Sequence, residues 1–596
     1  MEKQKLRSEI DEQYKWDLTP IYANKEVWYE DYTRAKSLIE EIKNYTDFLS
    51  SSSKLYDFLK YDEKVERLVY KLYYYAHLNY DADTLNDDYQ VMERKISDLM
   101  NHQNELSAFV MPTFLKVDFK TILQYIEEKP ELKEYHFTLE KLYRNKEHVL
   151  SEKEEEMLSL LNNNLANPSN TYEILTDSDL TFGTIHDEDG NEVELTESNY
   201  GKYTSSFNRK VRKQAFEKLY DTFANFKNTI TSTYLGDMDA NISLAKIRKY
   251  PSALEASLHA DNIDKKVYDN LISTIHDNLD VLYDYYDLKK QVLKLDELHL
   301  YDLHVPLIQL KKQQYDFEEA KKIVLDVVKI LGDDYVDIIK KEFNEKWIDV
   351  YNNKGKRTGA YSSGFYDTNP YILLNYEGRL EDVFTLIHES GHSAHTYLSC
   401  HNNSYTNSSY KIFVAEVASI TNELLLAKYL LKNSNSKEEK LNVLNRLLEL
   451  FKGTIYRQTM FAEFEKEMYD YRESGNVITS EFLCNEYYKL NKLYFGEKVV
   501  VDDSIRYEWE RVPHFYYNFY VYKYSIGLSA ACYIVENIIN GKENAVENYK
   551  SFLKSGGSMY PIDELKIAGV DVSKKEVVES AVRMFKETIE QFKSLI

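Results

Sequence analysis

Proline is missing from two long stretches of this 596-residue chain, residues 169–250 and 371–512. Only 9 Pro and 18 Gly occur in the whole sequence. Because these two residue types are the main interruptions of helices, the sequence leaves room for long helical runs. A chain of this length also exceeds one ordinary hydrophobic core, so we expect two or three mainly helical subdomains.

The apolar residues of the N-terminal region have the period of helices. From residue 27 to residue 150 they recur at three- and four-residue spacing, which predicts one amphipathic helix after another. One buried face is expected to contain Val65, Leu68, Val69, Leu72 and Tyr73. The helical pattern resumes over residues 208–247. The last helix is expected to begin at Ser573, with Ser573 and Glu576 as a capping box.

Two segments break the helical pattern and predict strands. Around Asp189-Gly190, two short extended runs flank a turn pair that favours a tight hairpin, and we expect a domain boundary near there. The segment TGAYSSGFYDTNPYILLNYEG contains three Gly, one Pro and the β-prone run from Tyr371 to Tyr376. We expect one or two strands in it.

Charge and cysteine usage restrict the partners and the compartment. Lys and Arg total 75 against 99 Asp and Glu, a net charge of −24, and such a field repels nucleic acid and anionic membranes. No run approaches the roughly 20 apolar residues of a membrane span, and the polar start lacks the apolar part of a signal peptide. The scattered Cys400, Cys484 and Cys532 suit a reducing cytosol. We expect a cytoplasmic protein without nucleic-acid or membrane partners, and no obligate protein partner is evident.

The motif His388-Glu389-Ser390-Gly391-His392 has the form HExxH. Residues four apart lie one turn above each other on a helix, so both imidazoles can bind one zinc ion. Glu389 can then reach a water at the metal as general base. The apolar residues Val383, Leu386 and Ile387 indicate that the motif lies on a buried helix.

The third ligand is predicted on a second helix. A catalytic zinc site takes three protein ligands, and no Asp or Glu occurs from Ser393 to Ala415. The first acid is Glu416, in the helical segment FVAEVASITNELLLAKYL. Glu423 lies on the same helix face as Glu416, so it is either a partner that orients a ligand histidine or an ordinary ion-paired residue. His395 is interpreted as a packing histidine in preference to a site residue.

At full length the chain resembles oligoendopeptidase F, of the thimet-oligopeptidase-like family of zinc peptidases. The resemblance is carried by HESGHSAH and by the segments YKWDLTPIY, RKYPSALEASL, GAYSSGFYDTNPYILLNY, FVAEVASITNE, VPHFYYNFYVYKYSIG and SGGSMYPIDELKIAGVD. The HExGH form with a later Glu is shared with the angiotensin-converting-enzyme group, and the flanking segments favour oligoendopeptidase F.

The resemblance implies a fold. We expect a mainly α multi-helix ellipsoid split by a deep channel, with a small β-sheet beside the zinc-site helices. It also implies an N-terminal helical region (1–115), an oligopeptidase F-type N-terminal domain (116–185) and a zinc metallopeptidase catalytic domain (200–590).

Further site residues follow from the same resemblance. The segment before HExxH is similar to the family's edge strand, which implies that Gly359, Ala360 and Tyr361 contact substrate. His514 and Tyr522 match the histidine and a tyrosine that stabilise the tetrahedral intermediate. Tyr516 and Tyr517 are both candidates for the other tyrosine, and Tyr517 is taken as the substrate-binding one.

We therefore expect a zinc endopeptidase with one Zn²⁺ per chain and oligopeptide substrates, in which Glu389, His514 and Tyr522 are catalytic. Two alternatives stay open. A dipeptidyl carboxypeptidase of the converting-enzyme type would need a cationic group for the substrate's terminal carboxylate. A catalytically silent peptide-binding scaffold is disfavoured by the intact Glu389, since binding zinc does not require that residue.

Overall fold

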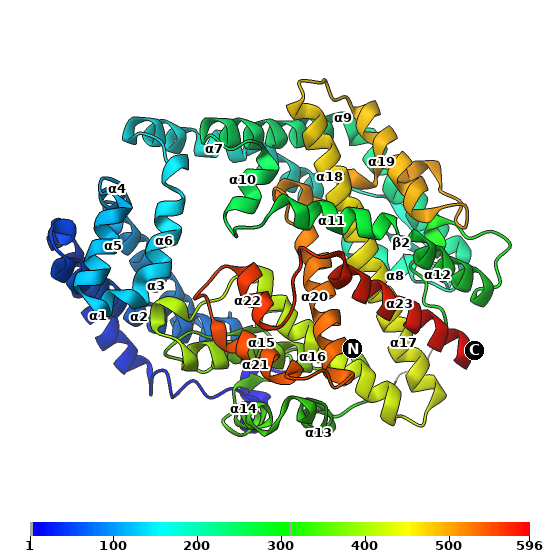
Figure 1. Cartoon of the computed structure of the whole chain (residues 1–596). Coiled ribbons are helices and arrows are strands. Elements are labelled where there is room, and N and C mark those ends of the chain that lie inside the picture. Colours follow the sequence, from blue (N-terminus) through cyan, green and yellow to red (C-terminus); the bar gives the residue numbers. More distant parts are fainter. Residues whose placement is uncertain (1–3, 310–312) are drawn as a thin grey trace. The chain divides into compact units, whose positions relative to one another are not determined.

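Two units, each assembled from three separate segments of the chain, make up the structure, a computed structural model that describes residues 4–309 and 313–596 (Figure 1). The first unit contains Met1–Lys146, Lys312–Tyr429 and Ile534–Val570. The second contains Glu147–Lys311, Leu430–Tyr533 and Asp571–Ile596. Helices dominate both, and the strands of the described residues form one two-stranded and one three-stranded sheet. The predicted mainly α class is confirmed.

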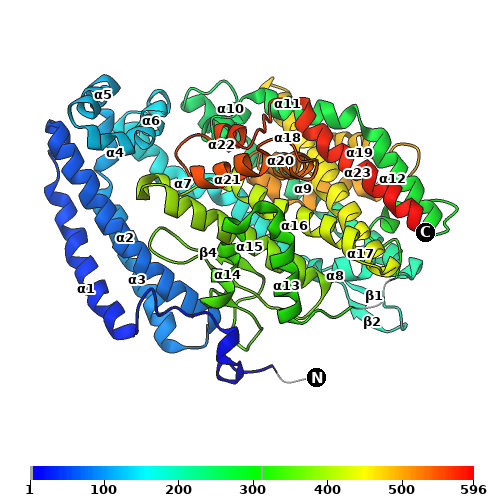
Figure 2. The same ribbon diagram turned by 60° about the horizontal axis from the view of Figure 1, so that its bottom comes forward.

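The N-terminal helices of the first unit pack side by side (Figure 2). Of the predicted apolar face of α2, Val65, Leu68, Val69 and Leu72 are buried, and Tyr73 is partly buried. The Trp28 indole of α1 donates to the Leu72 carbonyl oxygen at 2.9 Å. The helices of this unit are α1 (Lys25–Glu41), α2 (Ser52–Ala82), α3 (Asp87–Ser107), α4 (Val110–Leu115), α5 (Phe119–Glu128), α6 (His136–Arg144), α13 (Phe317–Val328), α14 (Asp333–Asn344), α15 (Leu380–Asn402), most of α16 (Ile412–Asn433), α21 (Ala545–Ser555) and α22 (Pro561–Ile567).

The three-stranded sheet also belongs to the first unit and has the order β3-β5-β4. The segment expected to hold one or two strands forms β4 (Tyr361–Ser363) and β5 (Tyr371–Leu373), paired antiparallel. β3 (Ile348–Asp349) joins β5 in parallel and was not expected, because two residues give no alternating pattern. Both β4 and β5 pack against α15, so the small sheet lies beside the HExxH helix as predicted.

The second unit contains the longest helix, α9, in the first proline-free stretch. Its predicted hairpin is present: β1 (Thr184–His186) pairs antiparallel with β2 (Glu192–Glu194) around Asp189-Gly190. The C-terminal α23 packs along α17 (Figure 1). The helices are α7 (Glu152–Ile174), α8 (Glu197–Thr204), α9 (Arg209–Ile247), α10 (Ala253–His259), α11 (Lys265–His276), α12 (Leu279–Val292), α17 (Lys437–Phe451), α18 (Gln458–Glu473), α19 (Ser480–Phe495), most of α20 (Tyr522–Ile539) and α23 (Lys575–Leu595).

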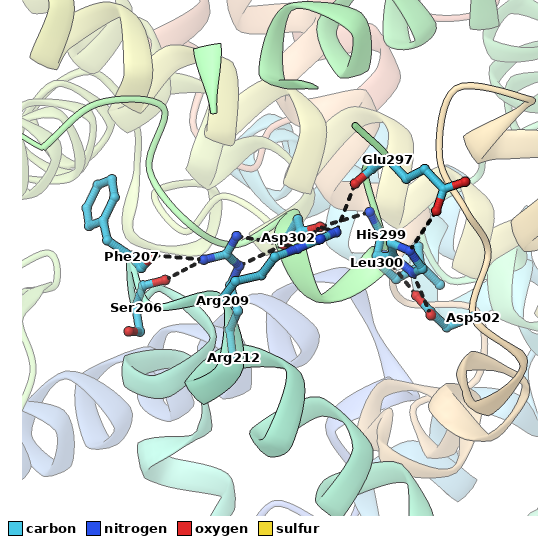
Figure 3. A network of polar contacts seen from close by, with 9 residues as sticks. All are labelled: Ser206, Phe207, Arg209, Arg212, Glu297, His299, Leu300, Asp302 and Asp502. Carbon is cyan, nitrogen blue, oxygen red and sulfur yellow. Dashed lines mark hydrogen bonds and ion pairs between the residues drawn. The ribbon is translucent and has the colours of Figure 1, made fainter. Parts of the chain in front are cut away.

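A polar network holds the start of α9 in the second unit (Figure 3). The buried Asp302 carboxylate accepts hydrogen bonds from Arg209 and Arg212, each at 2.8 Å. Beside it Asp502 accepts from the Leu300 N–H at 3.1 Å and pairs with His299 Nδ1 at 2.8 Å. Burial acts to raise the pKa of Asp302, but the arginines outweigh it and hold that pKa below its ordinary value.

The predicted capping box of the last helix is wrong. α23 begins at Lys575, and its N-cap Lys574 makes no side-chain capping hydrogen bond. The Ser573 hydroxyl instead donates to Asp571 Oδ1 at 2.6 Å, because an Asp two residues earlier offers a closer acceptor.

Candidate active site

The HExxH motif lies in the first half of α15. The Asp382 carboxylate accepts from the Arg379 N–H at 2.8 Å at the start of this helix, where an acid also suits the helix dipole. Val383, Leu386 and Ile387 are fully buried, as the sequence predicted. Packing therefore fixes the rotation of α15 about its axis, and with it the direction of the two histidines.

α16 crosses α15 closely enough to bring Glu416 to these histidines. The close approach depends on Gly391, the glycine of HESGH: a Cβ added there would lie 2.7 Å from Ser419 Cα and 3.0 Å from the Ala418 carbonyl oxygen. The Asn422 amide also donates to the Ile387 carbonyl oxygen at 3.4 Å. A small residue between the two ligand histidines thus lets the second helix supply an acid.

The three predicted ligands come together. Glu416 Oε2 lies 3.5 Å from His388 Nε2 and 3.7 Å from His392 Nε2. Among the described residues this is the one group of three or more His, Cys, Asp or Glu side chains whose ligand atoms all lie within 4.8 Å of one another. Two imidazoles and a carboxylate, with no thiolate, fit the donor set of a catalytic zinc site.

Glu423 orients the first histidine. Its Oε1 lies 2.6 Å from His388 Nδ1, which directs the opposite nitrogen, Nε2, toward Glu416. Burial acts to lower the pKa of His388, but the hydrogen bond and charge of Glu423 outweigh it and raise that pKa to about 9. Burial lowers the pKa of His392 to about 3, which keeps this imidazole neutral and able to bind a metal. Of the two readings of Glu423, the orienting partner is the one the geometry favours.

Glu389 is 7% exposed and stands beside the ligand group. Burial raises its pKa to about 7, and the charge of Glu416 adds to this shift. The charge of His388 and the Ser362 N–H, which donates to the carboxylate, both act to lower the pKa. A carboxyl group with a pKa near neutrality suits a group that must both take and release a proton. The Ser362 contact joins Glu389 to β4, and sequence reasoning missed it because it links residues far apart in the chain.

β4 is one of the two edge strands of its sheet, so one of its sides is unpaired within that sheet. Gly359 and Ala360 come directly before it, and Gly359 has a positive φ of 86° with open space where a Cβ would stand. Tyr361 is less free than expected, because its hydroxyl donates to Asp81 Oδ2 at 2.9 Å. Its side chain is therefore fixed by α2, and its place in the strand pairs it with Leu373 of β5.

His395 lies one turn beyond His392 but is a packing residue. It is 1% exposed, and its ring stacks on Tyr410 with centroids 3.6 Å apart. This agrees with the interpretation favoured from the sequence.

The remaining candidates lie in the second unit. Tyr522, at the start of α20, is 1% exposed and packs against Tyr268 with ring centroids 4.9 Å apart. His514 is half-buried, and its Nε2 lies 3.3 Å from the hydroxyl of Tyr524, a residue that the sequence analysis did not select. Burial lowers the pKa of His514, which favours the neutral imidazole.

The two open tyrosines differ in their surroundings. Tyr516 stacks on Tyr172, with centroids 4.3 Å apart, and its hydroxyl lies 2.8 Å from Thr233 Oγ1. Tyr517 is 50% exposed and lies edge-on to His514, with centroids 5.6 Å apart. Of the two, Tyr517 is the one able to contact a ligand in the unit as it stands.

Comparison with known protein families assigns most of this chain. A family described as Peptidase family M3 matches residues 202–584, and one described as Oligopeptidase F matches residues 114–182. The chain belongs to peptidase family M3. The three clustered ligands, Glu389 and His514 all fall inside the longer match.

Full-length relatives place this M3 peptidase near oligoendopeptidase F, which confirms the resemblance. This chain is 43% identical over 591 residues to "Oligopeptidase PepF" of Bacillus subtilis (strain 168). The alignment covers 99% of this chain and 88% of that protein. Among solved structures, a putative peptidase from Chlamydophila abortus aligns with TM-score 0.95 and 35% identity, covering 100% of both chains. Oligoendopeptidase-F from Enterococcus faecium aligns with TM-score 0.73 and 34% identity, covering 96% of this chain and 99% of that one.

Among the residues that the structure describes, no helix of this M3 peptidase is long and apolar enough to cross a membrane.

Proposed function

We propose that this chain is a zinc-dependent endopeptidase that hydrolyses internal bonds of oligopeptides. The convergence of His388, His392 and Glu416 from two helices, with Glu389 beside them, carries the proposal. Family M3 membership and the names of the relatives, oligopeptidase and oligoendopeptidase, support the substrate class.

His388, His392 and Glu416 would hold one Zn²⁺. When bound, zinc supplies a Lewis acid that makes water acidic near pH 7 and polarises a carbonyl group. The chain's own part is to turn the imidazoles correctly and to keep His392 neutral. Glu423 turns His388 through the Nδ1 hydrogen bond, and burial keeps His392 neutral.

Glu389 is the proposed general base. Its carboxylate accepts the proton of the attacking water and later delivers that proton to the nitrogen of the leaving amine. The Ser362 N–H, which donates to this carboxylate, keeps it beside β4. A peptide that adds to the free side of β4 would be held by its backbone, with Gly359, Ala360 and Tyr361 as its contacts.

His514 and a tyrosine of the same segment are proposed to stabilise the oxyanion, a contact class worth roughly 3 kcal/mol per donor. Tyr522 was assigned from the sequence, and its role remains a prediction. Tyr522 is buried against Tyr268, whereas the Tyr524 hydroxyl lies 3.3 Å from His514 Nε2. This difference favours Tyr524 for direct contact with the oxyanion. Tyr517 remains the proposed substrate-binding residue.

The test is a fluorogenic peptide blocked at both ends, incubated with zinc-loaded protein and with protein stripped by a chelator. We expect cleavage that is lost on stripping and restored by zinc. Cleavage of only unblocked peptides, two residues from their C-terminus, would indicate the dipeptidyl carboxypeptidase. No cleavage of any peptide despite stoichiometric zinc would indicate the silent scaffold.

A further inference from the structure

A cavity of about 540 Å³ lies in the first unit beside α2, and the reaction proposed above does not use it. One wall is a stripe of α2 side chains at four-residue spacing, Asp62, Glu66, Tyr70 and Tyr74. The opposite walls come from the loop between β4 and β5, with Phe365, and from the segment before α16, with Tyr405. Carboxylates and aromatic rings therefore face the same space, which we call the α2 cavity.

Two of the three carboxylates of the α2 cavity, those of Asp62 and Glu66, have no paired cation among the described residues. Glu63, the third acid there, pairs with Lys60 at 3.0 Å and Arg67 at 3.4 Å, and Arg67 also holds Asp367 at 2.6 Å. No lysine, arginine or histidine of the described residues forms an ion pair with Asp62 or Glu66. Within the described part of the chain, the one hydrogen bond to Glu66 comes from the Tyr405 hydroxyl.

The pKa values of Asp62 and Glu66 agree with the lack of a paired cation. Burial raises the pKa of Asp62 to about 6. Burial also raises the pKa of Glu66 to about 7, and the charge of Asp62 adds to the shift. An added cation would relieve both carboxylates, because an opposite charge favours their ionised form.

The aromatic rings suit the same cation. Tyr74 stacks on Phe365 with centroids 4.9 Å apart and planes 11° apart, and the Tyr70 ring lies 6.0 Å from Phe365. Ring faces beside carboxylates attract an ammonium or guanidinium group, and the rings also cover its apolar stem. The cavity is also lined by two lysines, Lys141 and Lys411, which form no ion pair with Asp62 or Glu66. The Lys141 ammonium lies 4.5 Å from the centre of the Phe137 ring. Burial lowers the pKa of Lys141, and the charge of Lys411 lowers it further.

The cavity adjoins the strand proposed to hold peptide. The Tyr74 hydroxyl donates to the carbonyl oxygen of Gly364, the residue directly after β4, at 3.1 Å. On another wall Tyr410 stacks on His395, one helical turn from His392. A side chain that projects from a peptide lying on β4 therefore has this space within reach.

We propose that the α2 cavity is a subsite for a cationic group of the peptide, with Asp62 and Glu66 as its charged partners. The inference rests on the proposed endopeptidase function. The group is a lysine or arginine side chain or the free amino terminus, which share this chemistry. The expected preference is at least about tenfold in kcat/KM, the range of a partly desolvated cation–π and ion-pair contact.

The experiment uses zinc-loaded full-length protein and decapeptides blocked at both ends, with lysine or norleucine at each position around the cleaved bond. A second set has a free amino terminus. The readout is the ratio of kcat/KM for the cationic peptide to that for its neutral twin. At one position we expect a ratio of about ten or more, falling to about one in Asp62→Asn/Glu66→Gln. If the double variant fails to fold, Glu66→Gln carries the test, because it retains an acceptor for Tyr405. Lys141→Met, on the same cavity, should keep the ratio.

A ratio near one at every position and at the free terminus, in protein that cleaves the neutral peptides, overturns the subsite alone. A preference for glutamate that Lys141→Met removes also overturns it. Where the preference appears, the blocked and free sets decide between a side chain and the terminus. Failure of every peptide to be cleaved would instead count against the proposed function.

Discussion

Glu389 of α15 and Glu342 of α14 are two buried glutamates whose pKa burial raises to about 7. Glu389 stands beside the metal ligands and accepts from the Ser362 N–H, whereas Glu342 on α14 accepts from the Ser390 hydroxyl at 2.6 Å. Similar burial thus accompanies two different contacts: the proton transfer is a proposal for Glu389, whereas Glu342 joins α14 to α15. This pair offers a matched test of the catalytic assignment.

Glu389→Gln should keep zinc and fold but lose activity by at least about a hundredfold, because an amide cannot accept the water's proton. Glu342→Gln is the control, and its turnover should stay within a few-fold of wild type. Turnover of a blocked peptide, together with zinc content and melting temperature, measures both. Near-normal turnover in Glu389→Gln would refute the general base.

Glu416 and Glu423 are separated by two helical turns on one face of α16, and we expect their substitution to affect zinc binding differently. Glu416→Ala removes one of three ligands, so zinc should be lost on dialysis. Glu423→Ala removes only the partner of His388 Nδ1, and we expect a loss of about 10–100-fold in affinity or activity. Zinc retained equally by wild type and Glu416→Ala would show that the third ligand is misassigned.

Glu465 of α18 predicts a pH dependence of stability. It is fully buried, accepts from the Phe519 N–H at 2.7 Å and has a pKa raised to about 8 by burial. Its folded pKa lies above its unfolded value near 4.5, so its contribution to stability is complete below pH 4.5 and is lost as pH rises through 8. The slope is at most about 1.4 kcal/mol per pH unit.

Melting temperatures at pH 6 and pH 8.5 test this. We expect wild type to lose stability between the two, and Glu465→Gln, which still accepts from Phe519, to lose less. The exposed Glu590→Gln serves as control. Equal losses in wild type and Glu465→Gln would mean that Glu465 does not titrate as described.

At the scale of elements, the α15–α16 crossing decides whether a metal site exists. Gly391→Ala would place a methyl group against the backbone of Ser419 and Ala418, so the helices must separate. Overpacking of this kind costs about 1–3 kcal/mol, and the separation also moves Glu416 from the histidines. We expect a lower melting temperature and weaker zinc binding. Gly201→Ala in α8, where a Cβ meets nothing within 4 Å, should cost neither.

Elements were predictable where the signal is local and not where distant segments meet. The ligands on α15 and the helix carrying Glu416 follow from spacing and periodicity. The Ser362–Glu389 and Tyr361–Asp81 contacts and the parallel pairing of β3 join distant residues, and a single sequence gives no pattern for them. Tyr522 and Tyr524 are two residues apart and so face different sides of α20. A shift of two positions is therefore enough to exchange a buried packing residue for a partly exposed one.

At the scale of the molecule, the resemblance predicts a zinc site on the floor of a channel. Oligopeptides, including those blocked at both ends, should then be cleaved, while a native globular protein should not. An extended peptide of roughly ten residues needs only about 3.3 Å per residue along β4. A blocked peptide and a stable folded protein, followed over the same hours, test this. Rapid digestion of the folded protein would refute the channel.

The sequence boundaries 1–115, 116–185 and 200–590 remain predictions. The two units follow a different division, because each combines three segments that are separated in the chain. Limited proteolysis followed by activity of the fragments is the measurement that separates the two descriptions.

A ribosome making this chain releases α15 long before that helix has its full set of neighbours. The His395 ring lies 5.4 Å from Phe552 of α21, and the Asn403 amide donates to the Lys554 carbonyl oxygen at 2.7 Å. Those partners are translated only after the whole of Leu430–Tyr533. While Leu430–Tyr533 is being translated, α15 therefore lacks its contacts with α21. A chaperone that binds exposed apolar surface would bind α15 in that interval. Premature termination between residues 417 and 544 would yield a chain that has every proposed zinc ligand but lacks α21, which packs against α15.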